Sequence, residues 1–185
     1  MKSVSFLGAG SWGTALAILC AGNGHKVTIW SKIQSEIDML RENREHVERL
    51  PGVKLPDSIV IEDDLERACT GQDILVWSVA SPYVRSTAQL AKPYIKEGQI
   101  IVNVGKGIEE GTLMTLCEVL ADELPMADPA VLSGPSHAEE VSKAMPTTVV
   151  VGAKTKKTAM FVQDVFMGNN FRVYTSPDMM GIELG

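Results

Sequence analysis

The chain has 185 residues, of which 45% are hydrophobic and 22% are charged, and its formal net charge is -6 at pH 7. This composition is typical of a globular protein and excludes a disordered or fibrous one, and the length fits one domain or one domain with part of a second. No apolar run reaches the roughly 18 residues of a membrane-spanning helix, the first residues do not resemble a signal peptide, and the acidic balance argues against general nucleic-acid binding. We therefore expect a cytoplasmic protein with no membrane insertion and no nucleic-acid partner.

The first elements are a strand, a glycine turn and a helix. An apolar run at 4–7 predicts the strand, and Gly8-Ala9-Gly10-Ser11-Trp12-Gly13 opens onto a helix over 12–21 that Asn23-Gly24 would close. In a G-x-G-x-x-G turn, Gly8 would make the tight bend, Gly10 would let a pyrophosphate approach the backbone, and Gly13 would let the helix pack on the strand. The phosphates would lie at the helix N-terminus. The alternative is a tight turn with no ligand.

The end of the second expected strand, at 26–30, bears on the choice of cofactor. In dinucleotide-binding folds an Asp or Glu about 20 residues beyond the glycine motif accepts hydrogen bonds from the ribose 2′-OH of NAD. Here that place reads Trp30-Ser31-Lys32-Ile33 and holds no carboxylate. Because Lys32 would attract a 2′-phosphate, we expect NADP to be accepted as well as NAD. The alternative is that Lys32 points to water.

The rest of the chain alternates helical patterns with apolar runs. Helices are expected at 34–44, 63–70, 81–92, 113–124 and 155–166, and strands at 73–79, 99–104, 130–132, 147–151 and 171–174. Ser176-Pro177 predicts the start of one more helix, with Ser176 as its cap. The run at 73–79 is almost continuously apolar, which is typical of a strand covered on both faces. This β-α-β pattern throughout predicts an α/β fold with a doubly wound, mostly parallel Rossmann-type sheet.

Two later segments follow strands, at the sheet edge where open α/β sheets bind ligands. Lys106 lies between two glycines and could polarise a carbonyl or hold an anionic oxygen. Ser133-Gly134-Pro135-Ser136-His137 offers hydroxyl and N–H groups to a polyol phosphate. The alternatives are a surface lysine in a flexible turn and a capped helix without a ligand.

The cysteines argue against a disulfide framework or a metal site. They are odd in number, lie far apart and form no C-x-x-C pair, and the histidines form no cluster. The three are Cys20, Cys69 and Cys117. We expect buried thiols in a reducing compartment and no metal.

Taken together, these motifs resemble the bacterial NAD(P)-dependent glycerol-3-phosphate dehydrogenases. The likeness runs through essentially all 185 residues, in GAGSWGTALA at 8–17, LPGVKLP at 50–56, GKGIE at 105–109, LSGPSHAEE at 132–140 and FRVY at 171–174. Their joint occurrence in this order is highly specific. The resemblance implies an oxidoreductase that interconverts dihydroxyacetone phosphate and sn-glycerol 3-phosphate with NAD(P)H and supplies glycerol phosphate for phospholipid synthesis.

The glycine turn and the resemblance together give a set of expected site residues. The cofactor-binding residues are Gly8, Gly10, Ser11, Trp12, Gly13, Lys32, Lys106 and Ala138. The substrate-binding residues are Lys106, Gly134 and Ser136. His137 is not the proton carrier in the resembled family. The position of Arg49 is aromatic in some relatives, and its role here is left open.

The resemblance places the general acid/base, a lysine, in a segment that would follow Gly185, so no catalytic residue is expected in this chain. Residues 1–185 would then form the NAD(P)-binding domain, would lack the second, all-helical domain, and would be inactive alone; the full-length protein could form a homodimer. Two other interpretations remain open. One is a different β-hydroxyacid-type dehydrogenase, which should lack the LSGPSHAEE and FRVY segments together, and the other is a non-enzymatic NAD(P)-binding module.

Overall fold

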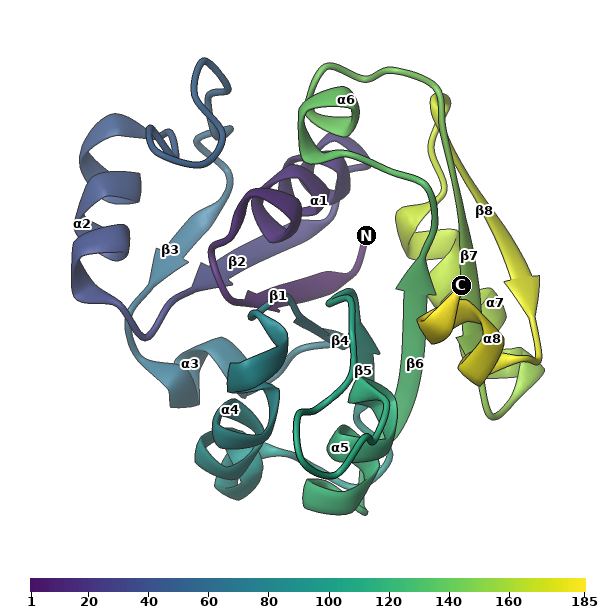
Figure 1. Ribbon diagram of the computed structural model, residues 1–185. Helices are drawn as coiled ribbons and strands as arrows, with labels where there is room; N and C mark the ends of the chain where they lie inside the picture. The colour runs from purple at the N-terminus through teal and green to yellow at the C-terminus, as the bar shows by residue number, and fades with distance from the viewer.

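The computed structural model describes residues 1–185 as one eight-stranded sheet with helices on both faces (Figure 1). The strands are β1 (Ser3–Leu7), β2 (Lys26–Trp30), β3 (Val60–Glu62), β4 (Ile74–Trp77), β5 (Ile100–Asn103), β6 (Asp128–Ser133), β7 (Thr147–Ala153) and β8 (Phe171–Ser176). The α-helices are α1 (Ser11–Gly22), α2 (Gln34–Asn43), α3 (Leu65–Cys69), α4 (Val84–Ala91), α5 (Leu116–Glu123), α6 (Ala138–Ser142), α7 (Lys156–Phe166) and α8 (Met179–Leu184). Two short 3-10 helices, η1 (Ser81–Tyr83) and η2 (Lys92–Tyr94), flank α4.

The strand order is β3-β2-β1-β4-β5-β6-β7-β8, and every neighbouring pair is parallel except β6 with β7. This arrangement confirms the predicted doubly wound, mostly parallel sheet. From β1 the chain first proceeds outward to β2 and β3, and it then returns to β4 on the other side of β1. The order therefore reverses between β1 and β4, and in open α/β sheets such a reversal leaves a crevice at the carboxyl ends of the strands.

The central strands are apolar on both faces, which is why helices cover both. In β4, Ile74 and Val76 pack in the layer that contains α1, α2, α6 and α7, whereas Leu75 and Trp77 pack in the layer of α3, α4 and α5. All four side chains are completely buried. This confirms a strand covered on both faces within the apolar run at 73–79, although the strand itself spans only Ile74–Trp77. No helix in the structure is both long and apolar enough to span a bilayer.

The pattern predicted from the sequence was wrong at two places in the sheet. The three-residue edge strand β3 had not been predicted, because it is too short to show a period. The β-α-β alternation fails between β6 and β7, which are antiparallel. The helix between them, α6, has only five residues and is therefore only about 7 to 8 Å long, too short to return the chain to the start of the sheet.

Two helix starts also differ from the prediction. The helix expected from residue 113 begins at Leu116, behind a capping box of Thr115 and Glu118, and Leu113 itself has a φ of 60° outside the helix. The cap of α8 is Asp178, whose side chain accepts a hydrogen bond from the N–H of Gly181 at 2.9 Å. Ser176, expected as that cap, is the last residue of β8.

Candidate cofactor site

A cavity of about 870 Å³ opens at the carboxyl edge of the sheet, over the reversal in strand order. Its volume lies in the range of about 300 to 1,000 Å³ that is usual for ligand pockets. The cavity is lined by the β1–α1 turn, the end of β2, the start of α2, the loop residue Arg49, the segments after β4 and β5, and the start of α6. Of the expected cofactor-binding residues, the following line it: Gly8, Gly10, Ser11, Trp12, Lys32, Lys106 and Ala138. The remaining one, Gly13, is buried and does not line it.

The three glycines of the turn differ in how much room a Cβ would have. Gly8 has a φ of 116°, and a Cβ there would lie 2.8 Å from the backbone of Ser78. A Cβ on Gly13 would lie 2.6 Å from Ser78 Oγ and 3.0 Å from the carbonyl of Gly8, so its absence lets α1 pack on the ends of β1 and β4. A Cβ on Gly10 would meet only ordinary contacts, at 3.9 Å or more. The space above Gly10 is therefore left for something other than protein.

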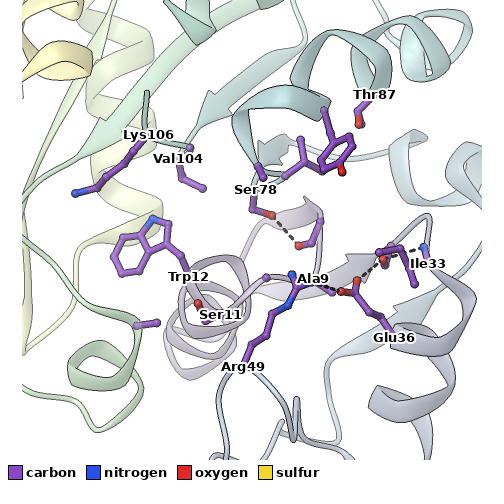
Figure 2. Close-up of a pocket in the computed structure, with 18 of the residues that line it drawn as sticks. Ala9, Ser11, Trp12, Ile33, Glu36, Arg49, Ser78, Thr87, Val104 and Lys106 are labelled. Atoms are coloured by element: carbon purple, nitrogen blue, oxygen red, sulfur yellow. Dashed lines mark hydrogen bonds and ion pairs between the residues drawn. The ribbon is translucent and has the colours of Figure 1, made fainter. Parts of the chain in front are cut away.

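The N-terminus of α1 faces this space with free backbone donors. The first intrahelical bond runs from the N–H of Thr14 to the carbonyl of Gly10 at 2.9 Å, and no side chain caps the helix. The N–H groups of Ser11, Trp12 and Gly13 precede that bond, and together with the helix dipole they favour an anion. The turn is held from below by Ser78, whose hydroxyl donates to the carbonyl of Gly8 at 2.8 Å (Figure 2). This arrangement fits the pyrophosphate of a dinucleotide.

The end of the cavity beside β2 contains a carboxylate that the sequence interpretation missed. Glu36, in the first turn of α2, is only 8% exposed and accepts a hydrogen bond from the hydroxyl of Ser31 at 2.6 Å. Its other oxygen lies 3.2 Å from Nη2 of Arg49 (Figure 2). The sequence analysis looked for a carboxylate directly at the end of β2. The carboxylate of Glu36 instead comes from the first turn of the following helix, α2. A Ser followed by Glu five residues later is the only signal in the sequence, and it is weak.

Arg49, whose role the sequence left open, belongs to this end of the cavity. Its Nη1 atom lies 4.0 Å from the position that a Cβ on Gly10 would occupy. Lys32 is exposed, lines the same end and makes no ion pair, so its ammonium is available to a ligand. Two cations therefore line this end of the cavity: Lys32 makes no ion pair, and Arg49 is paired with Glu36.

His46 supports the loop that carries Arg49. Its ring is completely buried, and Nδ1 accepts a hydrogen bond from the backbone N–H of Arg49 at 3.3 Å. Burial lowers the pKa of His46, and the nearby guanidinium of Arg49 lowers it further, while Glu36 opposes these effects. Because Nδ1 accepts, a neutral ring carries its proton on Nε2, which makes no hydrogen bond and lies 3.9 Å from the carboxylate of Glu36.

Lys106 lies near Trp12 at the other end of the cavity (Figure 2). Its neighbours there are Gly134 and Ser136. The ammonium of Lys106 donates to the carbonyl of Gly134 at 3.1 Å, and the hydroxyl of Ser136 donates to the same oxygen at 3.2 Å. Gly134 has a structural reason to be glycine, since a Cβ there would lie 2.8 Å from the carbonyl of Thr148. Ser136 and Lys106 line the cavity, whereas Gly134 contributes its carbonyl behind them.

The loop that follows Lys106 is held by an ion-pair cluster that the sequence interpretation also missed. Arg85 in α4 donates two hydrogen bonds to the carboxylate of Glu109, both at 2.8 Å, and further ones to Asp122 and Glu123 at 2.6 Å. The hydrogen bonds from Arg85, together with one from the hydroxyl of Thr112, lower the pKa of Glu109 to about 2. The cluster joins the GKGIE segment to α4 and α5, although no short spacing in the sequence marks it.

The remaining chemically active side chains form no second centre. His137 lines the cavity but is exposed and makes no side-chain hydrogen bond. The three cysteines are buried, free and unpaired, and burial raises the pKa of the Cys69 thiol to about 12. The structure contains no group of three or more metal-ligating side chains.

Comparison with protein families gives a match over most of the chain. The profile described as NAD-dependent glycerol-3-phosphate dehydrogenase N-terminus matches residues 3–159. A protein of Agathobacter rectalis named glycerol-3-phosphate dehydrogenase (NAD(P)+) is 60% identical over 185 residues, which are 100% of this chain and 55% of that protein. One of the same name from Fusobacterium nucleatum is 49% identical over 187 residues, covering 100% of this chain and 56% of that protein. The chain thus spans about half the length of these curated relatives.

Solved structures agree with the sequence comparison. The crystal structure of glycerol-3-phosphate dehydrogenase from Coxiella burnetii matches with a TM-score of 0.93 and 33% identity, over 98% of this chain and 56% of that one. A UDP-glucose dehydrogenase from Pyrobaculum islandicum matches with a TM-score of 0.72 and 19% identity, over 97% of this chain and 47% of that one. The second likeness concerns the fold alone.

Proposed function

The chain belongs to the NAD-dependent glycerol-3-phosphate dehydrogenase family, and from that premise we propose that residues 1–185 are the NAD(P)-binding domain of an enzyme that interconverts dihydroxyacetone phosphate and sn-glycerol 3-phosphate. In the cell this reaction would supply glycerol phosphate for phospholipid synthesis. The observation that carries the proposal is the open space above Gly10, which faces the free N–H groups of α1 inside a cavity of dinucleotide size.

The two ends of the cavity suggest how a dinucleotide would lie. Lys32 and Arg49, beside the end of β2, would hold the adenosine ribose and its 2′-phosphate, and the α1 N-terminus would hold the pyrophosphate. Ser11, Trp12 and Ala138 would line the path toward Lys106. When bound there, reduced nicotinamide would supply a hydride to a carbonyl carbon.

The substrate would lie beside Lys106. The ammonium of Lys106 can orient the substrate and stabilise negative charge on its carbonyl oxygen. The hydroxyl of Ser136 donates its one proton to the Gly134 carbonyl, so its oxygen can accept from a hydroxyl of the substrate. The same carbonyl holds the Lys106 ammonium, which has two further N–H donors. Lys106 and Ser136 make their hydrogen bonds to the Gly134 carbonyl and to no carboxylate or imidazole, which supports the proposal that the proton donor is not His137.

Several wider features belong to the same proposal. The protein would act in the cytoplasm, without membrane insertion and without a nucleic-acid partner, and it could form a homodimer together with the additional length that its relatives have. A different β-hydroxyacid-type dehydrogenase is less well supported, since the UDP-sugar dehydrogenase relative is similar in fold at only 19% identity.

The experiment is a comparison of dihydroxyacetone phosphate reduction. NADPH oxidation is followed for the 185-residue chain and for the full-length Agathobacter rectalis relative at equal concentration. We expect the relative to reduce dihydroxyacetone phosphate. The 185-residue chain should bind NADPH with activity near the assay floor, because the acid/base lysine is expected outside these residues and a positioned acid/base contributes about 10²- to 10⁴-fold to the rate. Comparable rates would mean that Lys106 or His137 carries the proton. An inactive relative would contradict the proposed reaction itself.

A further inference from the structure

Glu183, in the last helix α8, places its carboxylate beside the end of β5, the strand that precedes Lys106. Oε1 of Glu183 accepts a hydrogen bond from the backbone N–H of Cys117 at 2.9 Å and another from Nδ2 of Asn103 at 3.3 Å. Cys117 lies in the first turn of α5, and Asn103 is the last residue of β5. One carboxylate oxygen therefore ties α8 to β5 and to α5.

Asn103 in turn holds the turn that carries Lys106. Its side chain is completely buried. Nδ2 donates to the carbonyl of Gly105 at 3.2 Å, and Oδ1 accepts from the N–H of Gly105 at 3.0 Å. The space is tight as well, because a Cβ on Gly105 would lie 3.1 Å from Cδ1 of Leu116. The residue before Lys106 is thus fixed through both of its polar backbone groups.

Glu183 and the N–H of Gly105 together determine the orientation of the Asn103 amide. An amide has one donating end and one accepting end, and only the donating end suits a carboxylate. Rotation by half a turn would place Oδ1 against Glu183 and Nδ2 against the N–H of Gly105, and both contacts would be unfavourable in a buried place. The negative charge of Glu183 also suits the N-terminal turn of α5.

Lys106 depends on this backbone because little else holds its side chain. It is exposed, it makes no ion pair, and its one hydrogen bond goes to the Gly134 carbonyl. We propose that Glu183 is a positioning residue for Lys106, acting through Asn103 on the peptide units around Gly105. This inference rests on the proposed function, in which Lys106 contacts cofactor and substrate.

The test uses the 185-residue chain, with NADPH as the probe of the cavity. Glu183→Ala should raise the hydrogen-exchange rate of the Gly105 amide, followed by NMR without cofactor, about threefold to tenfold, as loss of one hydrogen bond predicts. NADPH affinity, measured by cofactor fluorescence, should fall by a similar factor. Glu183→Gln keeps an oxygen that can accept from both N–H groups, so its exchange rate and affinity should stay within about twofold of the parent.

Glu97→Ala is the matched control, because Glu97 is an exposed glutamate near the other end of β5. Unchanged Gly105 exchange in Glu183→Ala, or equal acceleration in Glu97→Ala, would overturn the proposal. If Glu183→Gln raises Gly105 exchange and lowers NADPH affinity as much as Glu183→Ala does, the proposal is also overturned, since the charge of Glu183 and not the orientation of the Asn103 amide would then hold Gly105. If circular dichroism finds Glu183→Ala unfolded, Glu183→Asp, which is too short to reach both N–H groups, should give the same acceleration. A parent chain that binds no NADPH would contradict the proposed function, while Gly105 exchange would still decide the positioning role.

Discussion

The guanidinium of Arg49 lies 3.2 Å from the carboxylate of Glu36, where the cavity borders the end of β2. Glu36 is 8% exposed, whereas the Arg49 side chain is 52% exposed and also approaches Gly10. A cation from a separate loop thus compensates an acid that would otherwise repel a phosphate. Glu36 thus brings a carboxylate to the end of the cavity where dinucleotide-binding folds hold the ribose, and Arg49 pairs with it.

Replacing Arg49 should therefore affect NADPH more than NADH. Arg49→Gln leaves Glu36 uncompensated in the cavity, and we expect NADPH to bind about tenfold more weakly, a change of 1.4 kcal/mol, with NADH changed by less than about threefold. Fluorescence titration with each cofactor measures both. Adding Glu36→Gln should restore part of the lost NADPH affinity. Equal losses for the two cofactors, or no restoration, would show that the pair does not act on the phosphate.

Lys32 gives an independent prediction at the same end of the cavity. As a charged donor to a 2′-phosphate it should contribute about 1.5 to 3 kcal/mol, so Lys32→Ala should weaken NADPH roughly tenfold to hundredfold and leave NADH nearly unchanged. Lys54→Ala is the control, since the ammonium of Lys54 pairs with Glu45 outside the cavity. Equal effects on both cofactors would mean that Lys32 points to water.

The ion pair between Arg85 and Glu109 should make stability depend on pH at the acid end. The pKa of Glu109 is lowered from 4.5 to about 2 in the folded state, so the contact stabilises the fold above about pH 4.5 and loses its effect as the pH falls toward 2. Thermal unfolding of the parent and of Arg85→Gln should therefore differ most above pH 4.5 and converge near pH 2. A constant difference across this range would contradict the assignment.

The sequence was sufficient for the parts of the fold that repeat a local pattern. The continuous apolar run of β4 and the glycine turn before α1 have physical requirements that few other sequences meet, and both were predicted correctly. The antiparallel pairing of β6 with β7 was not predictable in this way. It depends on the length of α6, which only the structure gives, because the five residues AEEVS at 138–142 are too few to show a helical period or to reveal where the helix ends.

The same distinction holds for the candidate site: residues in contiguous motifs were predictable, and residues that act through distant partners were not. Residues that belong to contiguous motifs, such as Ser11 and Lys106, were expected and line the cavity. Glu36 and Arg85 were missed, since each acts through partners that only tertiary folding brings near. Arg85 meets carboxylates 24 to 38 residues away in the chain, and no periodicity in one sequence reports such pairs.

The central claim is that the space above Gly10 receives a dinucleotide, and two glycine variants separate this claim from a structural role. Gly10 has an ordinary φ of -63° and room for a Cβ, so Gly10→Ala should unfold at the temperature of the parent. A Cβ on Gly13 would collide with Ser78, so Gly13→Ala should destabilise the fold, and it serves as the control for a structural glycine.

NADPH titration of the parent and of Gly10→Ala, with thermal unfolding of both, tests the claim most directly. We expect saturable binding to the parent and, in Gly10→Ala, an affinity lower by about tenfold or more at unchanged thermal stability, because the methyl group occupies the place of the pyrophosphate. Equal affinity in the two proteins, or no saturable binding to the parent, would contradict the claim.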